Sequence, residues 1–154
     1  MVPKYKIYLD NCCFNRPYDD QNYISINIET QAKLTIQSLV LDKLLFLVWS
    51  FILDYENNSN PDNNVKEEIA TWRKKADFIV KKSDVIIAKA KELHAAGFGK
   101  KDSLHLASAI ASDVEYFITV DKGIIKRKGK VAEIMYICNP VEFIGIIEEL
   151  HNEK

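Results

Sequence analysis

The sequence has little cysteine, no excess of either charge and no long apolar run. Its 21 Lys and Arg residues nearly balance its 22 Asp and Glu residues, so a net charge of −1 provides no overall basic field that would attract nucleic acid. Any such contact must come from a local patch. The longest apolar run, 44–53, is too short to cross a bilayer, and no signal-peptide pattern begins the chain. We therefore expect a cytoplasmic protein without a membrane segment.

Cysteine occurs three times, and two of the three are the neighbours Cys12 and Cys13. An odd number excludes a fully paired disulfide framework and indicates a reducing compartment. No spacing of Cys and His typical of a metal site is present, and no catalytic His or Asn motif accompanies the pair. We therefore expect Cys12 and Cys13 to be small packing residues rather than nucleophiles.

The remaining composition is that of a soluble globular protein. With 154 residues, 47% of them apolar, the chain can bury a proper core. No repeat, linker or low-complexity tract divides it, so we predict one domain over 1–154.

Apolar segments of strand length alternate with segments of helical periodicity. The predicted strands are 6–9, 44–49, 116–120 and 133–137. The predicted helices are 25–42, 51–56, 65–79, 85–96, 103–111 and 140–150, with a loop at 11–22 and a basic turn or short helix at 123–130. This alternation predicts an α/β fold whose mostly parallel sheet is covered by helices on both faces.

Four acidic residues lie at the edges of buried elements. Asp10 and Asp121 end predicted strands, and sites in open parallel sheets form beyond such ends. Glu56 follows the apolar Ile52 and Leu53 by four and three residues, so it should lie on the same buried face of its helix. Asp54 should lie on another face of this helix. Asp102 opens the buried helix before the strand that ends at Asp121. All four acids can therefore meet at one edge of the sheet.

Carboxylates brought together repel one another unless a cation offsets them. Oxygen ligands suit hard ions such as Mg²⁺ or Mn²⁺, which keep waters for a substrate. Such ions activate water and stabilise the leaving oxygen of a phosphodiester, so the pattern predicts hydrolysis of a nucleic acid backbone.

Each acid also has an ordinary structural alternative. Asp10 and Asp121 could form strand-end turns, and Asp102 could cap its own helix. Glu56 could be a solvated acid before an Asn-rich break, and His105, three residues after Asp102, is expected to be a structural polar residue.

At this point the motifs resemble a known family. Strand-Asp10, the segment 50–56, the segment 102–107 and the segment 119–121 resemble the successive motifs of the PIN-domain family. The closing 139–143 segment is similar to the end of many members. Order and spacing agree over essentially the whole chain, and the Asp102 motif is the most specific part.

The resemblance implies a three-layer α/β/α sandwich and a metal-dependent ribonuclease. Asp10, Glu56, Asp102 and Asp121 would be the catalytic, metal-binding acids for Mg²⁺ or Mn²⁺, with Thr119 as a supporting hydroxyl. Many bacterial members are VapC-like toxins of type II toxin–antitoxin pairs, often dimeric and held inactive by a small antitoxin. Many members carry Ser or Thr after the first Asp, whereas this chain has Asn11, which can still hydrogen-bond a metal-bound water.

Basic residues near these motifs are candidates for contacts to an RNA substrate. They are Arg16, Lys100, Lys101, Lys126, Arg127 and Lys128. Backbone phosphates are the groups that such side chains bind. The alternative for the 126–128 run is a solvated face.

Two other functions compete with the ribonuclease. One is a non-catalytic PIN-like module that binds RNA or protein. The other is a haloacid-dehalogenase-type phosphatase with Asp10 as nucleophile, but that chemistry needs a second Asp two residues later, where this chain has Cys12. The acidic constellation favours the ribonuclease.

Overall fold

A sheet of five parallel strands forms the centre of the structure, a computed structural model that describes residues 4–152, with side chains through residue 150. The strands are β1 (Tyr5–Leu9), β2 (Leu45–Ser50), β3 (Phe78–Val80), β4 (Tyr116–Ile118) and β5 (Tyr136–Cys138). Their order is β3-β2-β1-β4-β5, and every neighbouring pair runs parallel.

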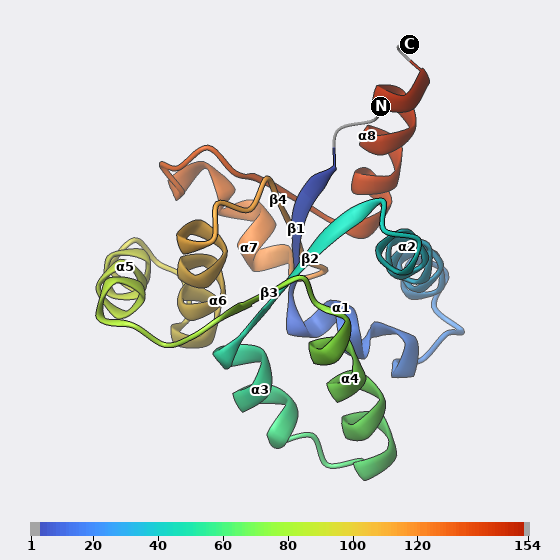
Figure 1. Ribbon diagram of the computed structural model, residues 1–154, viewed down its shortest axis with the longest axis horizontal. Helices are drawn as coiled ribbons and strands as arrows, with labels where there is room; N and C mark the ends of the chain where they lie inside the picture. Colours follow the sequence, from blue (N-terminus) through green and yellow to red (C-terminus); the bar gives the residue numbers. More distant parts are fainter. Residues whose placement is uncertain (1–3, 153–154) are drawn as a thin grey trace.

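Helices cover both faces of this sheet (Figure 1). They are α1 (Asn11–Asn15), α2 (Ile24–Leu41), α3 (Phe51–Asn58), α4 (Asn63–Lys75), α5 (Asp84–Ala95), α6 (Lys100–Ala111), α7 (Lys122–Lys126) and α8 (Pro140–Asn152), with 3₁₀ turns at Arg16–Tyr18 and Lys128–Lys130. Helices α5 and α6 pack together on one side of the sheet, and α2 packs with α8 on the other (Figure 1). The predicted three-layer sandwich with a parallel sheet is confirmed.

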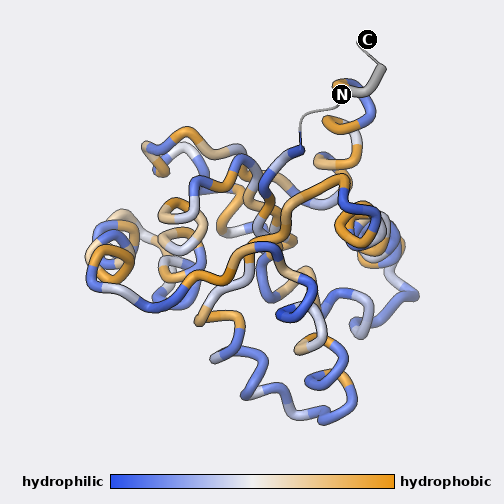
Figure 2. Tube along the Cα trace, viewed as in Figure 1, coloured by the Kyte–Doolittle hydropathy of each residue, from blue (hydrophilic) through white to orange (hydrophobic). Residues whose placement is uncertain are grey.

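The strands carry most of the apolar core. Ile7, Leu9, Leu47 and Phe117 are fully buried, as expected for strands covered on both faces. Figure 2 shows apolar segments concentrated along the strands, with hydrophilic segments around α3 and α4. None of the helices within residues 4–152 is long and apolar enough to cross a membrane.

The predicted loop at 11–22 is wrong over its first half. Residues 11–15 form α1, because the Asp10 side chain accepts a hydrogen bond from the Asn11 amide and caps this helix. Cys13 and Phe14 are fully buried on its inner face. Pro17 lies early in the following 3₁₀ turn, where its missing N–H costs little.

The predicted helix 65–79 is wrong at its end. Helix α4 ends at Lys75, Ala76 is extended, and Phe78–Val80 form a fifth strand beside β2. Asp77 fixes this change because its backbone N–H donates to Leu47 O at 2.9 Å and its Oδ2 accepts from Leu47 N at 2.9 Å. The last predicted strand, 133–137, is also displaced, since β5 begins only at Tyr136.

Several predicted helix starts are confirmed by their caps. Ser50 Oγ accepts from Leu53 N, and Ser83 Oγ accepts from Ile86 N. Asn139 Oδ1 accepts from Glu142 N at 2.8 Å and Glu142 Oε1 accepts from Asn139 N at 3.4 Å, so α8 opens with a capping box.

The sheet topology places two of the predicted acids next to each other. The chain builds outward from β1 to β2 and β3, then crosses over to add β4 and β5 on the other side of β1. The carboxyl ends of β1 and β4 therefore flank the point where the strand order reverses, which is where doubly wound sheets form binding crevices. Asp10 and Asp121 follow these two strands.

Candidate active site

Asp10 is held rigidly at the end of β1. Its backbone N–H donates to Ile118 O at 3.0 Å, and the residue is only 4% exposed. Oδ1 accepts from Asn11 N at 2.8 Å, and Oδ2 accepts from Thr119 Oγ1 at 2.8 Å. The Cys12 thiol also donates to Oδ2 at 3.4 Å. A buried carboxylate with several donors keeps its orientation without any ligand.

Thr119 connects this acid to Asp121. Its buried hydroxyl donates to Asp10 and accepts from the Asp121 backbone N–H at 3.0 Å. Asp121 Oδ1 in turn accepts from Gly123 N at 2.8 Å and Ile124 N at 3.1 Å, and so caps α7. Thr119 thus links two of the predicted acids, and its supporting role in catalysis stays a prediction.

Glu56 reaches the same place from α3. Its Oε2 accepts from Asn11 Nδ2 at 3.3 Å, and its Oε1 is hydrogen-bonded to His105 Nε2. Burial alone would raise the pKa of Glu56, but the hydrogen bond and charge of His105, with the charge of Lys101, lower this pKa below its usual value. Glu56 is therefore an ionised carboxylate, directed by two side-chain donors.

His105 belongs to a buried chain of hydrogen bonds behind Glu56. Its Nδ1 lies 2.6 Å from Tyr8 Oη, which lies 2.6 Å from Ser50 Oγ, and all three residues are fully buried. Burial disfavours the charged imidazole, yet the charges of Asp10 and Glu56 raise the pKa of His105 overall. The expected structural polar role is confirmed, and its partner is a predicted site residue.

Asp102 lies on the first turn of α6, where it could have served only as a cap. Gly99 is the N-cap residue, and the Asp102 carboxylate accepts no hydrogen bond from any residue in the described range 4–152. Burial, reinforced by the charges of Asp10 and Asp121, raises the pKa of Asp102 to about 6. Capping therefore does not account for this residue.

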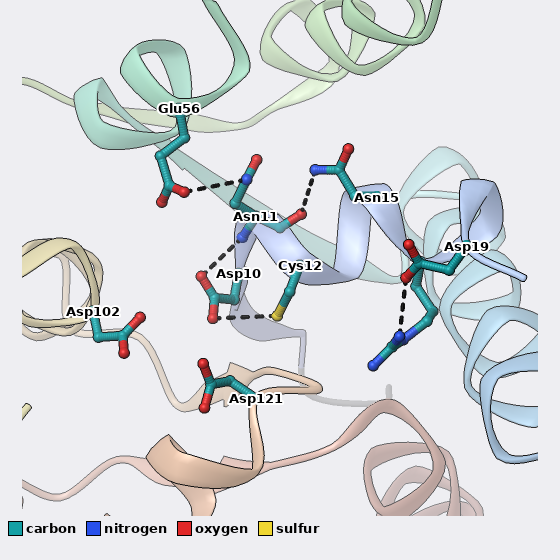
Figure 3. Close-up of a pocket in the computed structure, with 9 residues that line it drawn as sticks. Asp10, Asn11, Cys12, Asn15, Asp19, Glu56, Asp102 and Asp121 are labelled. Atoms are coloured by element: carbon teal, nitrogen blue, oxygen red, sulfur yellow. Dashed lines mark hydrogen bonds and ion pairs between the residues drawn. The ribbon is translucent and has the colours of Figure 1, made fainter. Parts of the chain in front are cut away.

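All four acids line one pocket of about 310 Å³, together with Asn11, Cys12, Asn15, Arg16 and Asp19. Figure 3 shows the carboxylates of Glu56, Asp102 and Asp121 directed toward the space in front of Asp10. Within the residues that the structure describes, no three His, Cys, Asp or Glu side chains converge closely enough to enclose a metal ion. Ligation by all four acids at once stays a prediction.

The pocket nevertheless fits a hard divalent cation. It offers carboxylate oxygens whose negative charges raise the pKa of Asp102, and a cation would offset those charges. Asn11 Oδ1 is buried there without a hydrogen-bond partner among the described residues. Mg²⁺ needs only one or two carboxylates and fills its other positions with water, so Asp10, Glu56, Asp102 and Asp121 could hold it without a closed cage.

The predicted RNA contacts fall into different places. Arg16 lines the acidic pocket but pairs with Asp19 at 2.9 Å and Glu29 at 3.4 Å. Lys100 and Lys101 are exposed at the start of α6.

The cluster after Asp121 divides in two. Lys126 and Arg127 line a second pocket with Gly129 and Lys130. Lys128 instead lies over the ring of Tyr136, 5.7 Å from its centroid.

Three parts of the site were not predicted from the sequence. Tyr8 and Ser50 support His105 from the strands, and Asn15 extends the pocket along α1, where its Nδ2 donates to Asn11 O at 3.0 Å. The sequence did contain a signal for Tyr8: it carries a polar hydroxyl in an otherwise apolar strand, two residues before Asp10.

The two cysteines also differ. Cys13 is fully buried, as predicted, whereas Cys12 lines the pocket. Contact with Cys13 and burial raise the pKa of the Cys12 thiol well above its usual value, so Cys12 is a neutral thiol.

Solved structures share this fold at low sequence identity. The chain matches the structure of VapBC2 from Rickettsia felis bound to a DNA fragment from their promoter, with a TM-score of 0.55 and 15% identity over 87% of this chain and 98% of the matched chain. The fold is PIN-like. FitAcB from Neisseria gonorrhoeae matches with a TM-score of 0.52 and 16% identity over 87% of this chain and 97% of that chain. VapBC-1 from nontypeable Haemophilus influenzae matches with a TM-score of 0.56 and 11% identity over 88% of this chain and 98% of that chain.

At these identities the likeness establishes the PIN-like fold and leaves the chemistry to the residues of the site. No protein-family model matches the sequence, and no curated protein matches it. The resemblance of the motifs is thus confirmed at the level of the fold.

Proposed function

We propose that this PIN-like protein is a metal-dependent ribonuclease that hydrolyses RNA phosphodiester bonds in the acidic pocket. The observation that carries the proposal is the gathering of Asp10, Glu56, Asp102 and Asp121 into one pocket from four separate segments. Burial and the charges of Asp10 and Asp121 disfavour the ionised form of Asp102, which makes no hydrogen bond that would compensate within residues 4–152. Binding of a cation, and through it of an anionic substrate, would explain why the four acids are gathered in one pocket.

Mg²⁺ or Mn²⁺ would be held by the carboxylates of this pocket, with Asn11 beside them. The chemistry that such an ion supplies is activation of water and stabilisation of the charge that develops on the departing oxygen. Asp10 is fixed by Asn11 N and Thr119 Oγ1, so it needs no rearrangement to act as a ligand. Preorganised charge of this kind lowers the cost of reaching the transition state.

Glu56 is the candidate to accept a proton from the attacking water. Hydrolysis adds water across a P–O bond, so one proton leaves the water and one reaches the departing oxygen. His105 and Asn11 direct the Glu56 carboxylate and keep it ionised, which leaves it able to take a proton.

A protein partner follows from the fold and the motifs taken together. VapBC2, FitAcB and VapBC-1 share the fold, and the motifs resemble those of VapC-like toxins. We propose that this chain pairs with a small antitoxin that holds it inactive, and that it forms a homodimer, as many VapC-like members do.

The test is cleavage of a short unstructured RNA by protein purified free of any antitoxin. We expect cleavage with Mn²⁺ or Mg²⁺, none with EDTA, and a loss of at least about 100-fold in Asp102→Asn, because one of the clustered charges is removed. Asp113→Asn is the matched control: Asp113 is exposed and has φ of 54°, a conformation that Asn tolerates as well as Asp.

Cleavage that persists equally in Asp102→Asn or in EDTA would contradict the proposal. RNA that binds but is never cut, with no response to the acids, would instead support a non-catalytic PIN-like binding module.

A further inference from the structure

The second pocket of the molecule is lined only by basic side chains and a glycine. Lys126, Arg127, Gly129 and Lys130 enclose about 240 Å³ at the end of α7 and in the following 3₁₀ turn. All four residues are exposed. The net charge of the chain is −1, so this local gathering of cations is not part of a general basic surface.

The cations of this pocket form no ion pair with the acidic side chains of residues 4–150. None of the ion pairs formed within residues 4–150 includes Lys126, Arg127 or Lys130, whereas Arg16 pairs with Asp19 and Glu29. The basic pocket therefore keeps positive charge available for a ligand.

The contacts that do exist are to backbone oxygens. Lys130 Nζ donates to Ala96 O at 3.0 Å, at the end of α5, and Arg127 Nη1 donates to Gly123 O at 3.3 Å. The first contact suits the negative end of a helix and gives Lys130 a structural role. The Arg127 guanidinium keeps further N–H groups for another acceptor.

Gly123 lies close to one side chain of each pocket. A Cβ on Gly123 would lie 3.0 Å from Asp121 Oδ1 and 3.4 Å from Arg127 Nη1, so both groups approach the same bare backbone. Gly97, with φ of +114°, likewise leaves space that Lys130 Nζ and Arg127 Nε approach to 3.5 and 3.8 Å from its missing Cβ. Arg127 of the basic pocket thus approaches the same glycine as Asp121 of the acidic pocket.

We propose that the pocket of Lys126, Arg127, Gly129 and Lys130 binds a backbone phosphate of the RNA strand, next to the phosphate that lies at the carboxylates. This inference rests on the proposed function. An acidic site repels the strand that it must cut, so the strand needs cations close to the acids but apart from them. A guanidinium matches a phosphate through paired N–H groups, and the neighbouring lysines add charge.

Lys128 provides an internal control for this assignment. It carries the same charge and lies between Arg127 and Gly129 in sequence, yet it lies over Tyr136 and does not line the pocket. A diffuse basic field would depend on Lys128 as much as on its neighbours, whereas a phosphate site would not.

The experiment measures binding, not cleavage, of a fluorescent single-stranded RNA to the full chain. Asp102→Asn is the background, and EDTA is present so that the RNA stays intact. In this background we expect Lys126→Gln with Arg127→Gln to weaken binding roughly tenfold and to reduce the salt dependence by about 0.7 in the slope of log K against log salt, as for one lost phosphate contact. Lys128→Gln should change affinity less than about twofold and leave the slope unchanged.

Two results would overturn the inference: an unchanged salt slope in the double variant, or an equal loss from Lys128→Gln. Equal competition by an acidic peptide of matched length and charge would also overturn it, in favour of a protein ligand. Unfolding midpoints verify that each variant folds. If the double variant does not fold, Lys126→Gln alone replaces it, since the Lys126 side chain makes no hydrogen bond within the described residues.

Failure of this inference is separate from failure of the proposed function. A protein that binds RNA as described but never cuts it retains the phosphate site and loses the ribonuclease. A protein that cuts RNA with all variants binding equally retains the ribonuclease and loses the phosphate site.

Discussion

Asp121 lines the acidic pocket and caps α7, whose last residue, Lys126, lines the basic pocket, and these two pockets are built in opposite ways. The acidic pocket uses short side chains rooted at strand and helix ends, and its central member Asp10 is 4% exposed. The basic pocket uses long, exposed side chains that follow a five-residue helix. Its cations contact carbonyl oxygens and, within residues 4–150, no carboxylate.

The difference shows how much each pocket matters to the fold. Removing a member of the buried network behind the acids leaves polar groups unpaired in the interior, which is costly. Removing the charge of Asp102, which accepts no hydrogen bond within the described residues, relieves repulsion and should stabilise the protein. Removing a cation from the exposed pocket should change stability little and ligand binding more.

The largest effect is expected from His105→Ala. This change leaves Tyr8 Oη and the Glu56 carboxylate without their shared partner in a fully buried place and opens a cavity. We expect the free energy of unfolding to fall by about 3 kcal/mol. Urea denaturation of the purified protein measures it.

His94→Ala is the matched control, because His94 is exposed and makes one hydrogen bond, from Nδ1 to Phe98 O at 2.8 Å. If His105→Ala and His94→Ala lost equal stability, the buried network behind the acidic pocket would contribute no more to stability than an exposed surface residue does, which would contradict this prediction.

An intermediate effect of opposite sign is expected from Asp102→Asn in EDTA. The pKa of Asp102 is raised to about 6 in the folded protein, so the folded state holds this proton more tightly than the unfolded state does. Wild-type stability from this group is therefore present at low pH and lost as pH rises through about 6. Since Asp102 is partly exposed, we expect the variant to be more stable by only about 1 kcal/mol at alkaline pH.

Urea denaturation at about pH 4.5 and about pH 8 measures this difference, which should be clearly smaller at the lower pH. Asp113→Asn removes the same charge outside the pocket and should show no such dependence. A gain of equal size at both pH values would show that repulsion among the acids is not its cause.

The smallest effect is expected from Arg16→Gln. Arg16 lines the acidic pocket, but Asp19 and Glu29 already balance its charge. RNA affinity should therefore fall by less than about twofold, and by less than in Arg127→Gln measured beside it. A larger loss of RNA affinity in Arg16→Gln than in Arg127→Gln would indicate that the main phosphate contact lies in the acidic pocket and not in the basic one.

The positions of the four acids could be predicted because local rules place them. Asp10 and Asp121 follow strands whose carboxyl ends share one edge, and Asp102 lies on the first turn of a helix of mostly small and apolar residues. Glu56 follows from helical spacing on a helix that Ser50 caps, and Asp54 is turned away as expected, bonded to Trp49 Nε1 and Arg73.

The errors have an equally physical origin. Residues 11–15 have too few apolar positions for a periodic signal, and only the Asp10 cap and the burial of Cys13 and Phe14 make them a helix. Phe78–Val80 continue the apolar spacing of α4, and only pairing with β2 makes them a strand. Short elements depend on their neighbours more than on their own pattern.

By itself the sequence determined the α/β class, the strand ends that carry Asp10 and Asp121, and the helix that carries Asp102, because periodicity and capping act over neighbouring residues. Only the tertiary structure decided which side chains meet. It brought His105 and Tyr8 behind Glu56 and separated Lys128 from the pocket of Lys126 and Arg127. The reason is that hydrogen bonds between side chains far apart in sequence depend on the crossing of whole strands and helices, which no local pattern encodes.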